Sequence, residues 1–293
     1  MKKIMVILNI YFILEVLFPA PSFSKFLPDN KLYEEDNIHG FTNVSKEDFY
    51  EVLNKLEAYY RPIVNKHGAF LDIYKSWESS TVNAYAQRDD DKWIIKMFGG
   101  MARRPEITKD AFLMIGCHEI GHHLGGFPFV SDWASNEGQS DYFAFHSCAK
   151  NMWKEEKEIN YEFSKIAQPI AIERCDKHYT SKDERRLCYR ASVAGESLAN
   201  LLSYLAKTEN PSFETPSEVE VDKTIYYHPH PQCRLDTFLA ASLCQTNFNV
   251  NNIPGETGSW KDAEIEAIQE SCSQLIASDK YSARPRCWFK QKY

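Results

Sequence analysis

Two periodic patterns of hydrophobic and polar residues follow one another along the chain. Apolar residues recur every three to four positions in several segments, which predicts helices with one buried face. These segments are 45–66, 108–124, 134–155, 162–178, 182–207, 231–245 and 261–277. Three shorter stretches, at 70–77, 81–87 and 92–98, have the pattern of strands. We therefore expect an α+β fold that is mainly helical, with one small sheet.

The most informative stretch is GCHEIGHHLGG at 116–126. On a helix, His118 and His122 lie four residues apart on one face and can bind a single ion. Glu119 lies beside them, which completes the H-E-x-x-H arrangement of zinc hydrolases, where the glutamate takes a proton from metal-bound water. His123 points elsewhere, so we interpret it as a supporting or structural residue.

A zinc hydrolase usually takes three protein ligands, and the helix supplies two of them. Glu137 follows His122 after fifteen residues, enough for a loop and a returning helix. Asp141 lies four residues further on, on the same helical face, and could accept the free N–H of a ligand histidine. Glu173 and Glu196 also lie on predicted helices, but they are more typical of solvated helix charges.

The beginning of the chain has the pattern of a secretory signal peptide. A basic start precedes an apolar stretch at 4–18, and cleavage after Ser24 would remove residues 1–24. A retained membrane anchor is the alternative, but Glu15 and a length below the about 20 residues of a span argue against it. We expect an exported protein, periplasmic or secreted, with no membrane span after signal removal.

The cysteine content supports export. Eight cysteines follow residue 24, and an even number in an exported chain favours disulfides. A second zinc site is the alternative, but no pair has the Cys-x-x-Cys spacing. The local pairs that the spacing favours are Cys175 with Cys188 and Cys272 with Cys287.

Two other expectations concern single cysteines. Cys233 and Cys244 share a predicted helix and would be too far apart to pair with each other. Cys117, beside a metal ligand on a buried helix, is the best candidate for a free thiol.

Several short motifs together resemble one family of enzymes. They are NAYA at 83–86, KWIIKMFGGM at 92–101, HEIGH at 118–122, EGQSD at 137–141 and HPHPQCR at 228–234. Their order over residues 70–245 is similar to that in the CAAX-prenyl-protease and HtpX-like group of gluzincin metallopeptidases. The eight cysteines and the tail after 245 depart from that pattern. Known members with several membrane spans also differ from this chain, which is more similar to soluble periplasmic members.

The resemblance implies a zincin-like domain with a complete set of site residues. Glu137 takes the position of the third ligand, with Ser140 in place of the usual alanine and Asp141 retained. His228 and Arg234 would complete the site, either by stabilising the oxyanion or by bracing Glu137. The alternative is that this pair has no role in the site and is a histidine at a helix start and a surface arginine.

The resemblance also implies how a substrate binds. An edge strand at 92–98 would lie beside the zinc helix and align an extended peptide by strand addition. The residues that would contact the peptide are Asn83, Ala84, Ile94, Ile95 and Lys96. An ordinary interior strand is the alternative.

These expectations combine into a zinc-dependent endopeptidase that hydrolyses exported or misfolded polypeptides. One Zn²⁺ per chain would be held by His118, His122 and Glu137, with Glu119 as general base. A cell-wall peptide amidase with the same ligands is one alternative. A non-catalytic zinc-containing chaperone-like protein is another, although the presence of Glu119 argues against it. The net charge of −7 argues against nucleic acid as a partner.

The predicted organisation is one compact domain with additions at both ends, because no flexible linker or internal repeat divides the chain. A helical segment at 25–69 follows the signal peptide, the metallopeptidase core covers 70–245, and a cysteine-containing extension at 246–293 packs on the core.

Overall fold

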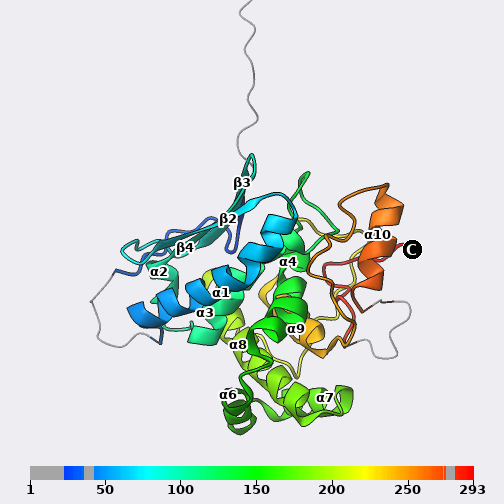
Figure 1. The fold of residues 1–293 in the computed structure, drawn as a ribbon. Coiled ribbons are helices and arrows are strands. Elements are labelled where there is room, and N and C mark those ends of the chain that lie inside the picture. The colour runs from blue at the N-terminus through cyan, green and yellow to red at the C-terminus, as the bar shows by residue number, and fades with distance from the viewer. Residues whose placement is uncertain (1–22, 36–42, 273, 275–280) are drawn as a thin grey trace, which may run out of the picture.

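A four-stranded mixed sheet covers one side of a group of helices (Figure 1). The structure, a computed structural model, describes residues 23–35, 43–272, 274 and 281–293. Strand order in the sheet is β1-β3-β4-β2, with β1 at Phe23–Lys25, β2 at Phe70–Ser76, β3 at Ala84–Asp89 and β4 at Lys92–Phe98. The expected α+β class with a small sheet is confirmed.

The expectation that β4 is an edge strand is wrong. β4 pairs in parallel with β2 and antiparallel with β3, so both of its hydrogen-bonding sides are used. Trp93, Ile95 and Met97 alternate with less buried residues along it. Such alternation shows which face of a strand is buried, and it contains no information on whether a neighbour lies on one side or on both. The outer neighbour of β3 is the short strand β1.

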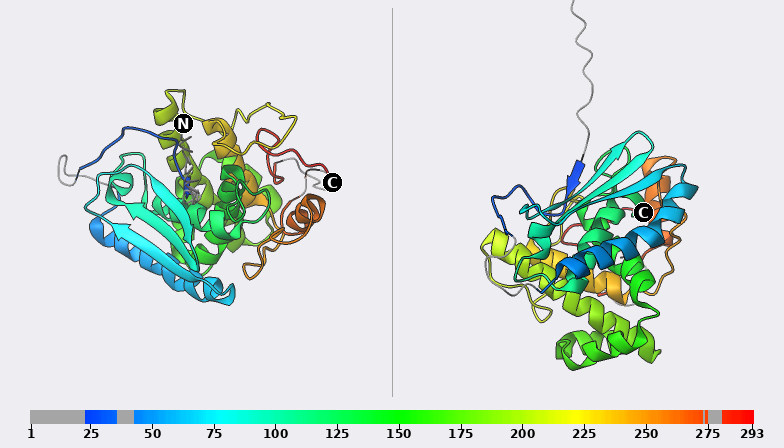
Figure 2. Two further views of the ribbon diagram at one scale, coloured as in Figure 1. Left: turned by 90° about the horizontal axis from the view of Figure 1, so that it is seen from above. Right: turned by 60° about the vertical axis from the view of Figure 1, so that its left-hand side comes forward.

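Helix α3 (Lys109–Leu124), which carries the HEIGH motif, lies at the centre of the molecule (Figure 2). It packs against the sheet and against helix α1 (Lys46–Lys66), and every residue from Ala111 to Leu124 is buried. A side chain caps the first turn of each of these two helices. Thr108 accepts a hydrogen bond from the backbone N–H of Ala111, and Ser45 begins α1 with a capping box.

One nearly continuous helical stretch returns along α3. It consists of α4 (Glu137–Phe143), the π-helical turn η1 (Ala144–Cys148) and α5 (Ala149–Trp153). The predicted helix at 134–155 is thus confirmed, with a later start because the Asn136 side chain caps α4. Gly138 is required here: a Cβ atom at this position would lie 2.3 Å from the ring of Trp288, which packs directly on α4.

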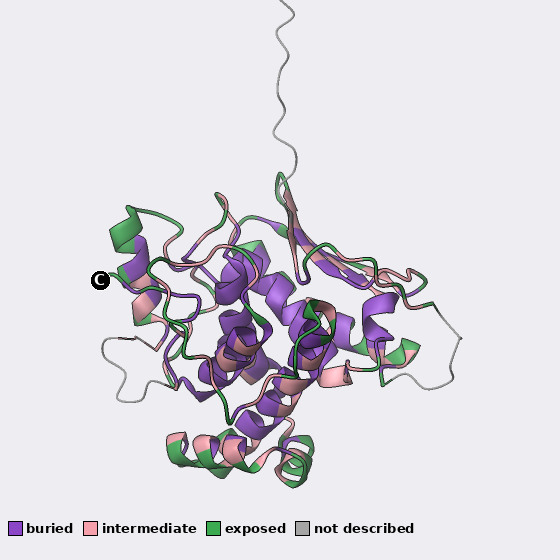
Figure 3. Ribbon diagram, turned by 180° about the vertical axis from the view of Figure 1, so that it is seen from behind, coloured by how far each residue is buried: buried purple, intermediate pink, exposed green. Residues whose placement is uncertain are grey.

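The remaining helices surround this centre. Figure 3 shows that α6 and α7 at the periphery are far more exposed than the central helices. The bounds are α2 (Gly99–Ala102), α6 (Lys157–Glu162), η2 (Phe163–Lys165), α7 (Pro169–His178), α8 (Lys182–Ala206), α9 (Pro231–Leu243) and α10 (Trp260–Gln269). The predicted helix at 162–178 is wrong in its first third, because Pro169 begins a new helix at N1. The helix predicted at 261–277 ends at Gln269.

Four disulfides connect these elements. Cys175–Cys188 joins α7 to α8, as the spacing predicted. Cys117–Cys148 joins α3 to η1, so the prediction of a free thiol at Cys117 is wrong. Cys117 is buried on a helix, but the returning helix places Cys148 within bonding distance, with 5.8 Å between the two Cα atoms.

The pairing of Cys272 with Cys287 is also wrong. Cys287 pairs with Cys233 at the start of α9, and Cys272 pairs with Cys244 at its end. As expected, Cys233 and Cys244 do not pair with each other. The two bonds attach the C-terminal region to both ends of one helix, a choice that depends on contacts between segments distant in sequence. Four disulfides suit an oxidising environment outside the cytosol.

The N-terminal region begins, in the described residues, with β1. The predicted signal peptide, 1–24, falls outside the described residues except for Phe23 and Ser24, which pair with β3. The region at 25–69, predicted to be helical, contains α1, but its described residues before Lys46 form no helix. Across the described ranges, none of the helices combines the length and apolar character needed to cross a bilayer.

Candidate metal centre

The close approach of α3 and α4 creates a cluster of polar side chains in the core. Gly121 permits this approach, since a Cβ atom there would lie 2.9 Å from the carbonyl oxygen of Ser140. His118 and His122 lie on the face of α3 that meets α4, with ring centroids 4.7 Å apart. Glu137, the first residue of α4, faces both rings.

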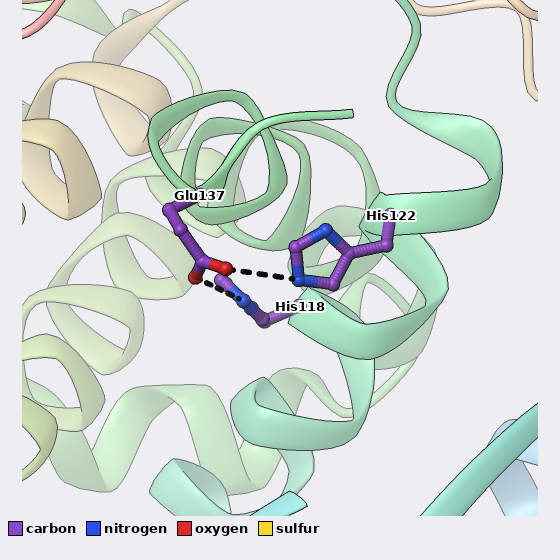
Figure 4. Close-up of side chains that lie close together, drawn as sticks. All are labelled: His118, His122 and Glu137. Atoms are coloured by element: carbon purple, nitrogen blue, oxygen red, sulfur yellow. Dashed lines mark ion pairs between the residues drawn. The ribbon is translucent and has the colours of Figure 1, made fainter. Parts of the chain in front are cut away.

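Figure 4 shows how these three side chains converge. Nε2 of His118 is 3.3 Å from Oε2 of Glu137, and Nε2 of His122 is 3.7 Å from Oε1. The three ligand atoms lie within 4.8 Å of one another, and all three residues are buried. This group could hold one metal ion.

Hydrogen bonds on the far side of each imidazole fix which nitrogen faces the cluster. Nδ1 of His118 is 2.7 Å from Oδ1 of Asp141, and Nδ1 of His122 is 2.8 Å from the carbonyl oxygen of Ser135. A carbonyl or carboxylate oxygen only accepts, so each Nδ1 carries the hydrogen and donates it. The lone pair of each Nε2 therefore points toward Glu137, which is the arrangement of metal-binding histidines.

Asp141 is itself held by Arg234. The guanidinium donates from Nε to Oδ2 at 2.7 Å and from Nη2 to Oδ1 at 2.8 Å, with both side chains about 1% exposed. Burial would raise the pKa of Asp141, but Arg234 and His118 hold it below its usual value. The expectation that Arg234 braces Glu137 is wrong in its partner: α9 directs the guanidinium to Asp141, one turn further along α4.

Glu119 and Glu137 have opposite electrostatic environments. Burial raises the pKa of Glu119 to about 8, and the nearby negative charge of Glu137 contributes. Burial acts in the same direction on Glu137, but His122, His118 and His228 bring its pKa to about 2. Two carboxyl groups with such separated pKa values suit different tasks, one exchanging protons and the other remaining an anion.

Several buried polar atoms in the cluster lack a hydrogen-bond partner, and they show whether a metal ion fits there. Among the described residues, none forms a hydrogen bond with Nε2 of His118, Nε2 of His122 or Oε2 of Glu137. Both carboxylate oxygens of Glu119 are equally without a hydrogen-bond partner in that part of the chain. Buried polar atoms are normally paired, so this concentration needs an explanation. A cation bound by the three ligand atoms supplies it, and the donor set fits the ion.

The other residues predicted for the site divide into two groups. His228 reaches it: Nε2 is 3.4 Å from Oε2 of Glu137. Asn83 and Ala84 lie near it, at the start of β3, and contact residues 26 and 27. The backbone of Ile94, Ile95 and Lys96 is not free to add a substrate strand, because β4 is paired with both β2 and β3. The side chain of Lys96 donates to Gln87.

Three further residues have clear places in the structure. His123 is stacked between Trp93 and Trp133, at centroid distances of 5.2 and 4.9 Å, which is a packing role. Glu173 and Glu196 lie on α7 and α8, outside the cluster.

Sequence reasoning missed Ser135 and Phe26. Ser135 orients His122 through its backbone carbonyl, a role that no side-chain pattern reveals. The ring of Phe26 packs edge-on against His118 at 5.1 Å, although it lies 92 positions earlier in the chain.

Comparison of the chain with protein-family models, with curated proteins and with solved structures found no match. The resemblance to the prenyl-protease and HtpX-like group therefore stays a prediction from the motifs.

Proposed function

We propose that the protein is a zinc-dependent endopeptidase with a zincin-like fold. The observation that carries the proposal is the buried His118, His122 and Glu137 cluster, with an unpartnered carboxyl group on the adjoining residue of α3. A purely structural ion would need no such group. Glu119 has a raised pKa beside the ligands, which is the property required of a residue that exchanges protons near neutral pH.

The donor set favours zinc. Two imidazole nitrogens and one carboxylate are typical ligands of catalytic zinc, which keeps a fourth position for water or substrate. When bound, the ion would lower the pKa of water and polarise a carbonyl group. One ion per chain is expected, because the described residues contain a single cluster of this kind.

The side chains around the cluster have distinct tasks in this proposal. Glu119 accepts a proton from the attacking water and delivers it to the leaving amine. His228 donates a hydrogen bond to the carbonyl oxygen of the scissile bond as negative charge develops there. Arg234 and Asp141 orient the ring of His118, so they are positioning residues.

An extended peptide substrate would bind beside β3. Both sides of β4 are occupied by β2 and β3, whereas the outer side of β3 is paired only with the short N-terminal strand β1, whose place a substrate would take. Asn83, directly before β3, bonds the backbone of Leu27 at this edge through its side-chain amide. Backbone hydrogen bonds along an edge give affinity with little sequence preference, which suits exported or misfolded polypeptides as substrates. A periplasmic or secreted location is consistent with the disulfides.

Metal analysis combined with one substitution tests the proposal. Purified protein should contain about one Zn²⁺ per chain, and it should hydrolyse casein. Glu119→Gln should retain the metal and lose roughly 10²- to 10⁴-fold in activity, since it removes the base and no ligand.

Glu158→Gln, an exposed change on α6, is the matched control and should leave both zinc content and activity unchanged. If the Glu119→Gln variant contains zinc and hydrolyses casein as fast as wild type, Glu119 is not the general base. Absence of bound zinc with both histidines intact would contradict the whole proposal.

A further inference from the structure

We propose that the Lys25–Phe26 peptide bond is a substrate of this metal centre, so that the chain cleaves its own N-terminal segment. The inference rests on the proposed function and goes beyond it by naming a cleavage site and a preferred residue after it. It begins from the position of residues 23–27, which lie at the edge of the sheet where a substrate would bind (Figure 2).

The segment pairs with β3 as an added strand would. Phe23, Ser24 and Lys25 are antiparallel to β3, with Lys25 opposite Tyr85. The N–H of Phe26 continues the pattern and donates to the carbonyl oxygen of Ala84 at 3.2 Å. Strand β1 and the next residue, Phe26, therefore already occupy the outer edge of β3, and the chain bends from Phe26 onward.

Side chains from separate motifs contact consecutive backbone groups of this segment. His228 donates to the carbonyl oxygen of Lys25 at 2.8 Å, through the same Nε2 that is 3.4 Å from Glu137.

Arg234 donates to the next carbonyl oxygen, that of Phe26, at 2.9 Å. The Asn83 amide bonds both the N–H and the carbonyl of Leu27, at 3.0 and 3.1 Å. A strand that served only to complete the sheet would need none of these side chains.

The side chain after the proposed scissile bond is held in a defined place. Phe26 is fully buried, with its ring edge-on to His118 and the guanidinium of Arg234 4.6 Å from its centroid. Leu27 is also fully buried. This packing orients the backbone at the bond, and it favours a large apolar residue directly after the cleaved bond.

The reaction is a hydrolysis. The oxygen of water bonds to the carbonyl carbon of Lys25, and the bond from that carbon to the nitrogen of Phe26 breaks. Glu119 takes the proton of the water and passes it to that nitrogen, while His228 donates to the carbonyl oxygen. The products are a carboxylate on Lys25 and an amine on Phe26.

The test uses the full chain with its disulfides formed, first kept with a chelator and then given Zn²⁺. Intact mass and N-terminal sequence are followed with time. We expect a chain that begins at Phe26, produced at a rate that does not change on dilution, because the segment is bound in its own molecule. Glu119→Gln should keep the Lys25–Phe26 bond intact.

Casein hydrolysis separates the two proposals. Wild-type protein that hydrolyses casein but keeps the Lys25–Phe26 bond would overturn this inference and leave the proposed function standing. If neither casein nor the bond is cleaved, both fail. Cleavage before Phe26 in the Glu119→Gln variant would also overturn the inference. So would a wild-type chain that begins at Lys25 and is not cleaved further after Zn²⁺ is added.

A matched pair of variants tests the role of the buried ring. Phe26→Ala should slow self-cleavage by roughly 10- to 200-fold, the effect of losing apolar contacts in a specificity pocket. Ser24→Ala, two residues earlier on β1, should not slow it. Retained casein hydrolysis by Phe26→Ala would show that the variant is folded, and an unchanged rate of self-cleavage in it would count against the inference.

Discussion

Two buried arginines tie helices together in this protein, and their surroundings differ. Arg190 on α8 donates two hydrogen bonds to Asp110 and others to Glu156 and Asn160. Its guanidinium also lies 4.5 Å from the centroid of the Trp153 ring. Among the described residues, no polar side-chain atom of Arg190, Asp110, Glu156 or Asn160 is buried without a hydrogen-bond partner, and we call these four residues the closed network.

Arg234 on α9 begins a different chain of contacts. It bonds both oxygens of Asp141, which accepts from His118, and that histidine then presents an unpaired nitrogen to the cluster. Buried pairs with complete hydrogen bonding fix the packing of helices. The network around Arg234 instead fixes the position of His118, whose Nε2 has no hydrogen-bond partner among the described residues and can bind a ligand. The concentration of unpaired polar atoms on neighbouring side chains, more than the buried charge, distinguishes this site from the ion pairs of Arg190.

Removal of a metal ligand should have the largest effect. Glu137→Gln keeps the shape of the side chain and loses the anion, so zinc affinity should fall by more than the ~10- to 100-fold typical of a lost outer partner. Glu196→Gln, on α8 outside the cluster, should leave zinc affinity unchanged. Titration against a competing chelator measures both. Equal affinity in the two variants would remove Glu137 from the ligand set.

Removing each arginine compares the networks directly. Arg234→Ala leaves Asp141 as an uncompensated buried charge, so the free energy of unfolding should fall by about 3 to 5 kcal/mol. Zinc affinity should fall as well, by roughly 10- to 100-fold.

Arg190→Ala should lower the free energy of unfolding by less, about 1 to 3 kcal/mol, because Asp110 and Glu156 keep some contact with water. Its zinc affinity should not change. Urea unfolding and zinc titration of both variants give the answer, and a weakened zinc site in Arg190→Ala would erase the distinction.

Disulfides offer a third contrast between the site and the periphery. Replacing Cys117 and Cys148 by serine opens a 31-residue separation, and replacing Cys175 and Cys188 opens one of 13. Loop entropy predicts losses of about 4 and about 3 kcal/mol in the free energy of unfolding. Zinc affinity should fall only in the first variant, because Cys117 adjoins His118. Similar zinc affinities in the two double variants would show that this bond does not support the site.

The smallest expected effect is the pH dependence of the closed network. Burial would raise the pKa of Glu156, but Lys55 and Arg190 hold it below its usual value of 4.5. A lowered folded-state pKa stabilises the protein above the unfolded value, and this contribution is lost as pH falls through the folded-state pKa.

The stability difference between wild type and Glu156→Gln should therefore be constant above about pH 5.5 and shrink below pH 4.5. Urea unfolding across this range measures it. A difference that grows toward low pH would reverse the assigned direction.

Much of the secondary structure was predictable because it depends on near neighbours in the chain. Ser45 and Thr108 mark helix starts, and the periodic apolar residues of α1 and α8 define the buried faces of these two helices. The errors arose where several short helices follow one another, as before Pro169, since one periodic pattern can extend across a break that tertiary contacts create.

The same division separates the parts of the candidate site. The spacing of His118, Glu119 and His122 is a property of one helix, and the sequence determined it by itself because a helical turn fixes which residues share a face. Their convergence with Glu137 depends on the close contact of α3 and α4 at Gly121. That contact forms only when the two helices pack in the folded molecule.

Other features were decided entirely by contacts between distant segments. Arg234 bonds Asp141, 93 positions earlier, and Cys233 pairs with Cys287. The edge strands of the sheet are β1 and β2, although β4 was expected to lie at an edge. The alternating burial of a strand indicates that a partner exists, and so do an even number of cysteines and a buried arginine. None of them states which partner, because strand neighbours and side-chain pairs are selected by the packing of the whole chain.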